Sequence, residues 1–144
     1  MLQGYHFKNL SGLLQLELPR NNIKSLNKLL FTELSSLRSL DLTNNGGIQI
    51  EPHSFQNLIN LEEFTCHSCY LESLHPDLFL GLVNLLRLCL HNNKLKQLPQ
   101  TIFQNQQKLQ SLNLNKNQLG TLPDGVFDNL KNLSDIHNLV TNLS

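Results

Sequence analysis

The chain has 144 residues with 11 acidic and 11 basic side chains, so its formal net charge is zero. Such a balance supplies no overall field toward nucleic acid or an anionic membrane, and we expect neither as a partner. Leucine makes up about a quarter of the residues, and this bias indicates one short apolar pattern repeated along the chain.

The start of the chain, MLQGYHFKNL, lacks the continuous apolar core of a secretory signal. No run of about eighteen apolar residues that could span a bilayer follows it. Two interpretations stay open at this point: the protein is intracellular, or the sequence is a piece of something longer.

Phenylalanine reveals a repeat of 24 residues. Six of the seven phenylalanines keep this spacing, namely Phe7, Phe31, Phe55, Phe79, Phe103 and Phe127. A leucine follows each by three residues, except at Gln106, and a new repeat opens three residues later. We predict one continuous solenoid without end caps. Its expected parts are a partial repeat at 1–12, complete repeats at 13–36, 37–60, 61–84, 85–108 and 109–132, and a partial repeat at 133–144.

The fifth complete repeat, LQSLNLNKNQLGTLPDGVFDNLKN, indicates what each repeat builds. Its first half alternates leucine with polar residues, which predicts a short strand with one apolar face. One such strand cannot stand alone, so successive repeats must stack their strands in parallel around a shared leucine core. The second half returns as loop or short helical turn. The expected fold is therefore an α/β-type repeat solenoid shaped like a horseshoe, with a parallel sheet on the concave face and loops and short helical turns on the convex face.

This pattern, LxxLxLxxNxLxxLPxxxFxxLxx, is that of leucine-rich repeat proteins in the 24-residue form of extracellular receptors and matrix proteins. The chain resembles the ectodomains of Toll-like receptors and the variable lymphocyte receptors of jawless vertebrates, the latter especially in the stretch LPDGVFDNLKNL. The resemblance implies a non-catalytic receptor fragment, extracellular or on the cell surface, that recognises a protein or glycan ligand on the concave strands. The alternative in the same class is a cytoplasmic scaffold for signalling proteins. Uncapped ends also predict some self-association.

The ninth position of each repeat places a polar residue in the leucine core. These residues are Asn21, Asn45, Cys69, Asn93 and Asn117. A buried polar group costs free energy unless it is hydrogen-bonded, so we expect these side chains to form a ladder with the backbone of neighbouring turns.

The same register assigns the side chains that point away from the core on the concave strands. The predicted ligand-binding residues are Glu17, Arg20, Asp41, Thr43, Glu63, Thr65, His67, Arg87, Cys89, His91, Asn113 and Asn115. Residues 1–84 carry five basic and eight acidic side chains, whereas residues 85–144 carry six and three. We therefore expect a charge gradient along the solenoid that orients a partner.

Cys66 and Cys69 form a C-x-x-C pair on inward positions, which we interpret as buried structural thiols, with a disulfide or half a metal site as the alternatives. Cys89 falls on an outward position and should be accessible. His67 and His91 lie in register on neighbouring repeats, and with Cys89 they define a rival hypothesis, a metalloprotein or enzyme. No nucleophile with its base and no phosphate loop accompanies them, so we predict neither catalysis, cofactor nor metal.

Two smaller features complete the analysis. Gly46 and Gly47 put glycine where the second repeat should have leucine, and we expect a local bulge in which Ile48 fills the gap. The N-x-S sequons at Asn9, Asn132 and Asn142 would be glycan sites in a secreted protein.

Overall fold

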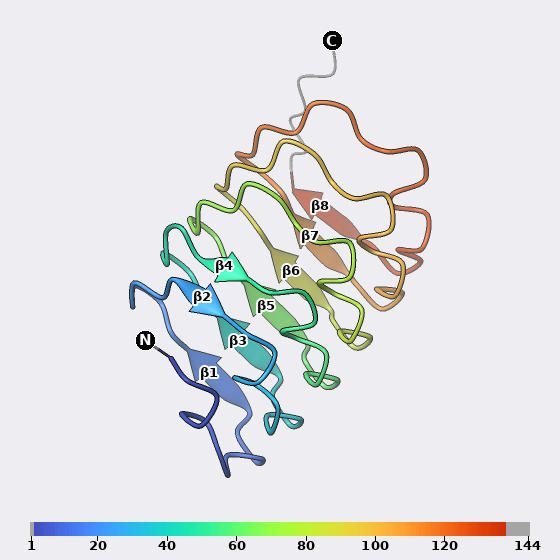
Figure 1. Ribbon diagram of the computed structural model, residues 1–144. Coiled ribbons are helices and arrows are strands. Elements are labelled where there is room, and N and C mark those ends of the chain that lie inside the picture. The colour runs from blue at the N-terminus through green and yellow to red at the C-terminus, as the bar shows by residue number, and fades with distance from the viewer. Residues whose placement is uncertain (1, 138–144) are drawn as a thin grey trace.

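A computed structural model describes residues 2–137. They form a series of similar turns that stack one on the next (Figure 1). Each turn contributes one short strand to a six-stranded sheet along one side of the stack. These strands are β1 (Gln15–Glu17), β3 (Ser39–Asp41), β5 (Glu63–Thr65), β6 (Arg87–Cys89), β7 (Ser111–Asn113) and β8 (Asp135–His137). The chain is thus a parallel-strand solenoid of about five turns, as the repeat predicted.

Strand pairing in the large sheet keeps the 24-residue offset throughout. Leu16 pairs with Leu40, Leu40 with Phe64 and Phe64 with Leu88, all in parallel. The central residue of each inner strand points into the core and is nearly inaccessible, with Leu40, Phe64 and Leu88 at most 2% exposed. The outward residues on either side of it alternate with the core residues because a strand has a period of two. The register of the sheet therefore decides which side chains share its outward face, which we call the concave face after the expected horseshoe.

A second, two-stranded sheet lies on the back of the stack. Its strands are β2 (Ser25–Leu26) and β4 (Gln49–Ile50), which pair in parallel. Within residues 2–137 no further back strand continues this pairing after β4. The backs of the first two complete repeats are thus tied together, whereas the backs of the second and third are not.

The convex side is built of turns, and the expectation of short helical turns is not confirmed, since residues 2–137 contain no helix. Single turns such as Leu58 N–H to Phe55 C=O (3.0 Å) and Leu61 N–H to Leu58 C=O (3.1 Å) follow each other without the continuous bonding of a helix. The phenylalanine rings stack between repeats, with centroids 6.1 Å apart for Phe31 and Phe55. Ring stacking and leucine burial hold this side without a helix.

Three residues after each of the first five strands of the large sheet lies a residue with positive φ, a regularity that the apolar pattern does not reveal. The residues are Arg20, Asn44, Ser68, Asn92 and Lys116, with φ between 56° and 60°. This left-handed step turns the chain sharply, so that the next residue, the ladder position, points inward. Asparagine tolerates the conformation better than other side chains do, which is why Asn44-Asn45 and Asn92-Asn93 suit the turn.

Candidate functional site

The concave face of the six-stranded sheet is the candidate site, and the structure places the predicted residues on it in rows that run across the strands. Glu17, Arg20 and Arg87 are exposed, whereas Asp41 and Thr65 are half-buried. Glu63, His67, Cys89, His91, Asn113 and Asn115 are also half-buried. These side chains thus line one continuous polar surface.

The structure differs from the sequence analysis at Thr43. Its side chain is only 6% exposed, and its hydroxyl oxygen is buried without a hydrogen-bond partner. The Thr43 backbone N–H donates a hydrogen bond to the Asp41 carboxylate at 2.8 Å, and this bond closes a tight turn at the end of β3. Thr43 therefore belongs to the wall beneath the surface, and it does not present its hydroxyl to a ligand.

Two ion pairs link neighbouring strands, and both join residues 24 positions apart. Arg38 contacts Glu62 at 2.8 Å, and Arg87 contacts Glu63. All four side chains are at least one third exposed to solvent, so each pair contributes little to stability. They matter for the electrostatic surface instead, because they neutralise four charges between neighbouring repeats, whereas Glu17 and Lys116 toward the two ends join no ion pair among the described residues. Sequence reasoning missed Arg38 and Glu62, although opposite charges one period apart were a signal for them.

A shallow pocket of about 200 Å³ lies on the C-terminal part of the face, over β5, β6, β7 and β8. Its lining includes Thr65, Arg87, Cys89, Asn113 and His137. His137 was not predicted as a site residue, because it falls in the partial repeat at the end of the register. Hydroxyl, amide, guanidinium and imidazole groups can all hydrogen-bond a polar ligand.

His67 and His91 lie side by side, with ring centroids 6.0 Å apart. The Nδ1 atom of His67 is 3.2 Å from the Ser68 hydroxyl, whereas Nδ1 of His91 is buried without a partner. Within residues 2–137 no three histidine, cysteine, aspartate or glutamate side chains gather as metal ligands. The rival metal hypothesis built on these histidines and Cys89 therefore gains no support from the geometry.

Cys89 is a free, half-buried thiol on the outward side of β6. Burial raises the pKa of this thiol, a hydrogen bond from the His91 backbone partly lowers it, and the negative charge of Asp41 raises it further. The thiol is consequently held in its neutral, weakly reactive form, which suits a surface for contact rather than a nucleophile.

Cys66 and Cys69 correct another expectation, since they are joined by a disulfide and are not free thiols. Both are fully buried, and their Cα atoms are 5.8 Å apart, within the range that a disulfide bridges. The inward direction of both positions was predicted from the register, but the same register also brings the two sulfurs together. The disulfide ties the end of β5 to the turn that follows it.

The asparagines at the ninth position contact backbone groups of neighbouring repeats. Asn45 accepts hydrogen bonds from Asn21 N–H (3.0 Å) and Ile23 N–H (2.9 Å), and its amide donates to the Leu18 carbonyl at 2.9 Å. Asn93 repeats the arrangement, and Asn117 repeats it with a single donor to its oxygen, the Leu95 N–H at 3.1 Å. Asn21 differs, because it is exposed and donates only to the Pro19 carbonyl at 3.0 Å. In the described residues no strand lies beyond β1 to supply partners for it.

The repeat matches a known family. A BspA type leucine-rich repeat region matches residues 1–134 in six copies. No match was found among curated proteins.

Solved structures with a similar fold include a chain of the glycosylated Toll–Spatzle complex from Drosophila, with a TM-score of 0.87 and 26% identity over 99% of this chain and 19% of that one. The leucine-rich repeat protein LIC12759 of Leptospira interrogans gives a TM-score of 0.73 and 30% identity, over 90% of this chain and 32% of that one. A chain of the TLR13–ssRNA13 complex, at 24% identity and a TM-score of 0.66 over 92% and 22% of the two chains, shares the fold alone. The present chain spans between about a fifth and a third of the length of these structures.

Proposed function

The chain belongs to the BspA-type leucine-rich repeat family, and we propose that it is a non-catalytic recognition module that binds a protein or glycan ligand on the concave face of its six-stranded sheet. We also propose that its complete repeats are the five 24-residue units that begin at residue 13 and end at residue 132. The family is one of repeats, and no comparison points to a catalytic family.

The observation that carries the proposal is the set of polar side chains that line the shallow pocket over β5 to β8. The pocket offers hydrogen-bond donors and acceptors from the side chains of Thr65, Asn113 and His137. The side chains of Asn113 and His137 pair only with residues of their own repeat, and none of the three side chains is hydrogen-bonded to a neighbouring strand among the described residues. A rigid parallel sheet holds these groups at fixed spacing, which lowers the entropy lost on binding. Unpaired charges toward the two ends would orient an incoming partner.

We further propose that the module is part of an extracellular or cell-surface receptor of the immune type. The likeness to a chain of the Toll–Spatzle complex, a molecular hub in Drosophila development and innate immunity, supports this assignment. The Cys66–Cys69 disulfide supports it independently, because disulfides persist mainly in oxidising compartments. The free thiol of Cys89 favours the alternative, a cytoplasmic scaffold. Within residues 2–137 no helix has the length and apolarity to span a bilayer.

A crosslinking experiment tests the concave face. The photoreactive residue p-benzoylphenylalanine is introduced at Thr65 or Asn113, and in matched variants at Gln104 or Asp128 on the phenylalanine side. Irradiation in the presence of extracellular fluid should give one crosslinked adduct from the concave positions. An excess of the chain without the photoreactive residue should abolish this adduct, and mass spectrometry then identifies the partner. Adducts that form equally well from Gln104 and Asp128 would contradict the proposal.

A further inference from the structure

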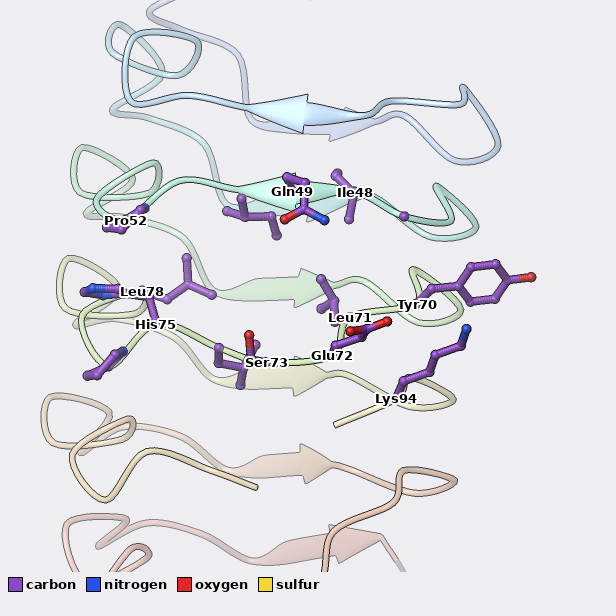
Figure 2. Close-up of a pocket in the computed structure, with 14 residues that line it drawn as sticks. Ile48, Gln49, Pro52, Tyr70, Leu71, Glu72, Ser73, His75, Leu78 and Lys94 are labelled. Carbon is purple, nitrogen blue, oxygen red and sulfur yellow. The ribbon is translucent and has the colours of Figure 1, made fainter. Parts of the chain in front are cut away.

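A second hollow lies on the back of the stack, away from the concave sheet. It has a volume of about 670 Å³ and runs between β4 and the facing stretch of the third repeat, residues 70–76. Figure 2 shows Ile48 and Gln49 on one wall and Leu71, Glu72 and Ser73 on the other. We call this hollow the back groove. Its size falls in the range of ligand-binding pockets.

The two glycines of the second repeat shape one end of the groove. Gly47 has a φ of +81°, and its N–H donates to the Cys69 carbonyl at 2.9 Å. The chain then turns Ile48 into the core, where it is 3% exposed and fills the space that a leucine would occupy in the other repeats. This path brings the next residues into β4, which pairs with β2 on its other side.

The groove side of β4 is an unused strand edge. Gln49 N–H donates to Lys24 C=O at 2.8 Å and Glu51 N–H to Leu26 C=O at 3.0 Å, so these residues face β2. Because successive peptide groups of a strand point to opposite sides, the N–H and C=O of Ile50 face the groove. Within residues 2–137 neither group has a backbone partner.

The opposite wall is also extended backbone without partners. Glu72, Ser73 and Leu74 make no backbone hydrogen bonds to other described residues. Leu71 and Leu74 are 6% exposed and form an apolar floor between the walls. Donors and acceptors thus line both sides of a trough with an aliphatic base, which matches the main chain and alternate side chains of an extended peptide.

Charge and aromatic packing narrow the choice of occupant. Glu72 is exposed on the wall and joins no ion pair in the described part of the chain, so it favours a basic side chain opposite it. Lys94 also lines the groove, but it lies at the Tyr70 end (Figure 2). Lys94 Nζ lies over the Tyr70 ring, 4.7 Å from its centroid, in a cation–π contact. The same ring packs on Gly46, where an added methyl group would come within 2.8 Å of a ring carbon. The exposed ring of Tyr70 is therefore already engaged by Lys94 and Gly46 and is not open for a sugar to stack on it.

We propose that the back groove binds an extended peptide segment of a partner protein, with a lysine or arginine near its middle, as an added strand beside β4. The six residues of the β4 wall, 47–52, span at most about 20 Å. A segment of roughly five or six residues fills that length. This site is independent of the concave face, and either can fail without the other.

Nuclear magnetic resonance on the isotope-labelled chain tests the proposal with the peptide acetyl-Thr-Val-Lys-Val-Thr-amide as the probe. Millimolar peptide should shift the Ile50 and Ser73 amide signals and slow hydrogen exchange at Ile50 by about fivefold or more near saturation. The charge reversal Glu72→Lys should weaken binding by about fivefold. The same variant should instead prefer the peptide in which glutamate replaces lysine.

The variant Asp124→Lys makes the same change of charge in the fifth repeat, away from the groove, and should leave peptide binding unaltered. Unchanged Ile50 exchange at the highest soluble peptide concentration would overturn the proposal, as would equal binding of the lysine and glutamate peptides. Chitohexaose serves as the competing probe. If it shifts the signals of Tyr70 and Lys94 while the peptide leaves Ile50 unprotected, the groove is a sugar site and the peptide proposal is wrong.

Discussion

The side-chain amide of Asn93 donates to the carbonyl oxygen of Cys66 at 2.9 Å, across the boundary between two repeats. The same amide donates to Leu90 C=O at 3.0 Å, and its oxygen accepts from the N–H groups of Cys69 and Leu71, both at 3.0 Å. One 5%-exposed side chain thus satisfies backbone groups on two successive turns. The stacking of repeats depends on such polar contacts as well as on leucine burial.

Asn93→Ala should lower the free energy of unfolding by about 1–3 kcal/mol, because two buried N–H groups lose their acceptor. Urea unfolding followed by circular dichroism measures the change. Gln97→Ala in the same repeat is the control, since Gln97 is exposed, and it should leave stability within about 0.5 kcal/mol of the parent chain. Equal effects of the two substitutions would contradict a structural role for Asn93.

Gly81 is a tighter constraint than its place on a loop suggests. A Cβ atom at this position would lie 2.6 Å from the backbone carbonyl oxygen of Gln56 and 2.8 Å from its Cα. Backbone cannot move aside as a flexible side chain does, so Gly81→Ala should cost about 1–3 kcal/mol. Gly12→Ala meets nothing within 4 Å and should be neutral. Thermal melts of both variants decide the matter, and a Gly81→Ala protein as stable as Gly12→Ala would show that the two turns are not packed this closely.

Gln106 replaces the leucine that follows the phenylalanine in every other repeat. It is 1% exposed, its amide donates to Phe79 C=O at 2.6 Å and to Leu82 C=O at 3.2 Å, and its side-chain oxygen has no partner among the described residues. Phe79 C=O keeps a second donor, the Leu82 N–H at 3.0 Å. Gln106→Leu should therefore stabilise the chain by about 1–2 kcal/mol, because it removes a buried acceptor that lacks a donor. The exposed neighbour provides the control Gln107→Leu, for which no gain in melting temperature is expected.

The repeat period made the large sheet predictable, because a strict 24-residue offset leaves one register in which all leucines are buried. The rows of Glu63 with Arg87 and of His67 with His91 followed from the same offset. The disulfide, the burial of Thr43 and the β2–β4 pairing did not. These features depend on distances of a few ångströms between side chains of adjacent turns, and a pattern of residue types does not carry that information.

Thiol labelling tests both the Cys66–Cys69 disulfide and the environment of the free thiol of Cys89. Without reductant only one of the three cysteines should react with Ellman's reagent after unfolding, and all three should react after reduction. In the folded chain the raised pKa of Cys89 means fewer thiolate anions at pH 8 than in free cysteine. Its labelling should therefore be slow at pH 8 and accelerate as the pH rises through the raised pKa. Asp41→Asn removes a charge that raises this pKa, so labelling at pH 8 should become faster.

The partner identified by crosslinking at Thr65 allows a kinetic test of the concave face. His67→Ala and His91→Ala should raise the dissociation rate and leave the association rate unchanged, because these half-buried rings act only after contact. Glu63→Arg or Arg87→Glu should lower the association rate by roughly threefold to tenfold and flatten its dependence on salt, because each weakens the charge gradient.

A lower association rate in these variants could come from a weaker charge gradient or from loss of the ion pair between Glu63 and Arg87, and a double variant separates the two causes. The double variant Glu63→Arg with Arg87→Glu restores the pair and leaves the net charge unaltered, but it inverts the gradient at the centre of the face. If the partner is oriented by the gradient, the association rate measured by surface plasmon resonance stays low in the double variant. If the association rate returns to that of the parent chain, the partner requires only an intact ion pair on the surface, and orientation by the gradient is wrong.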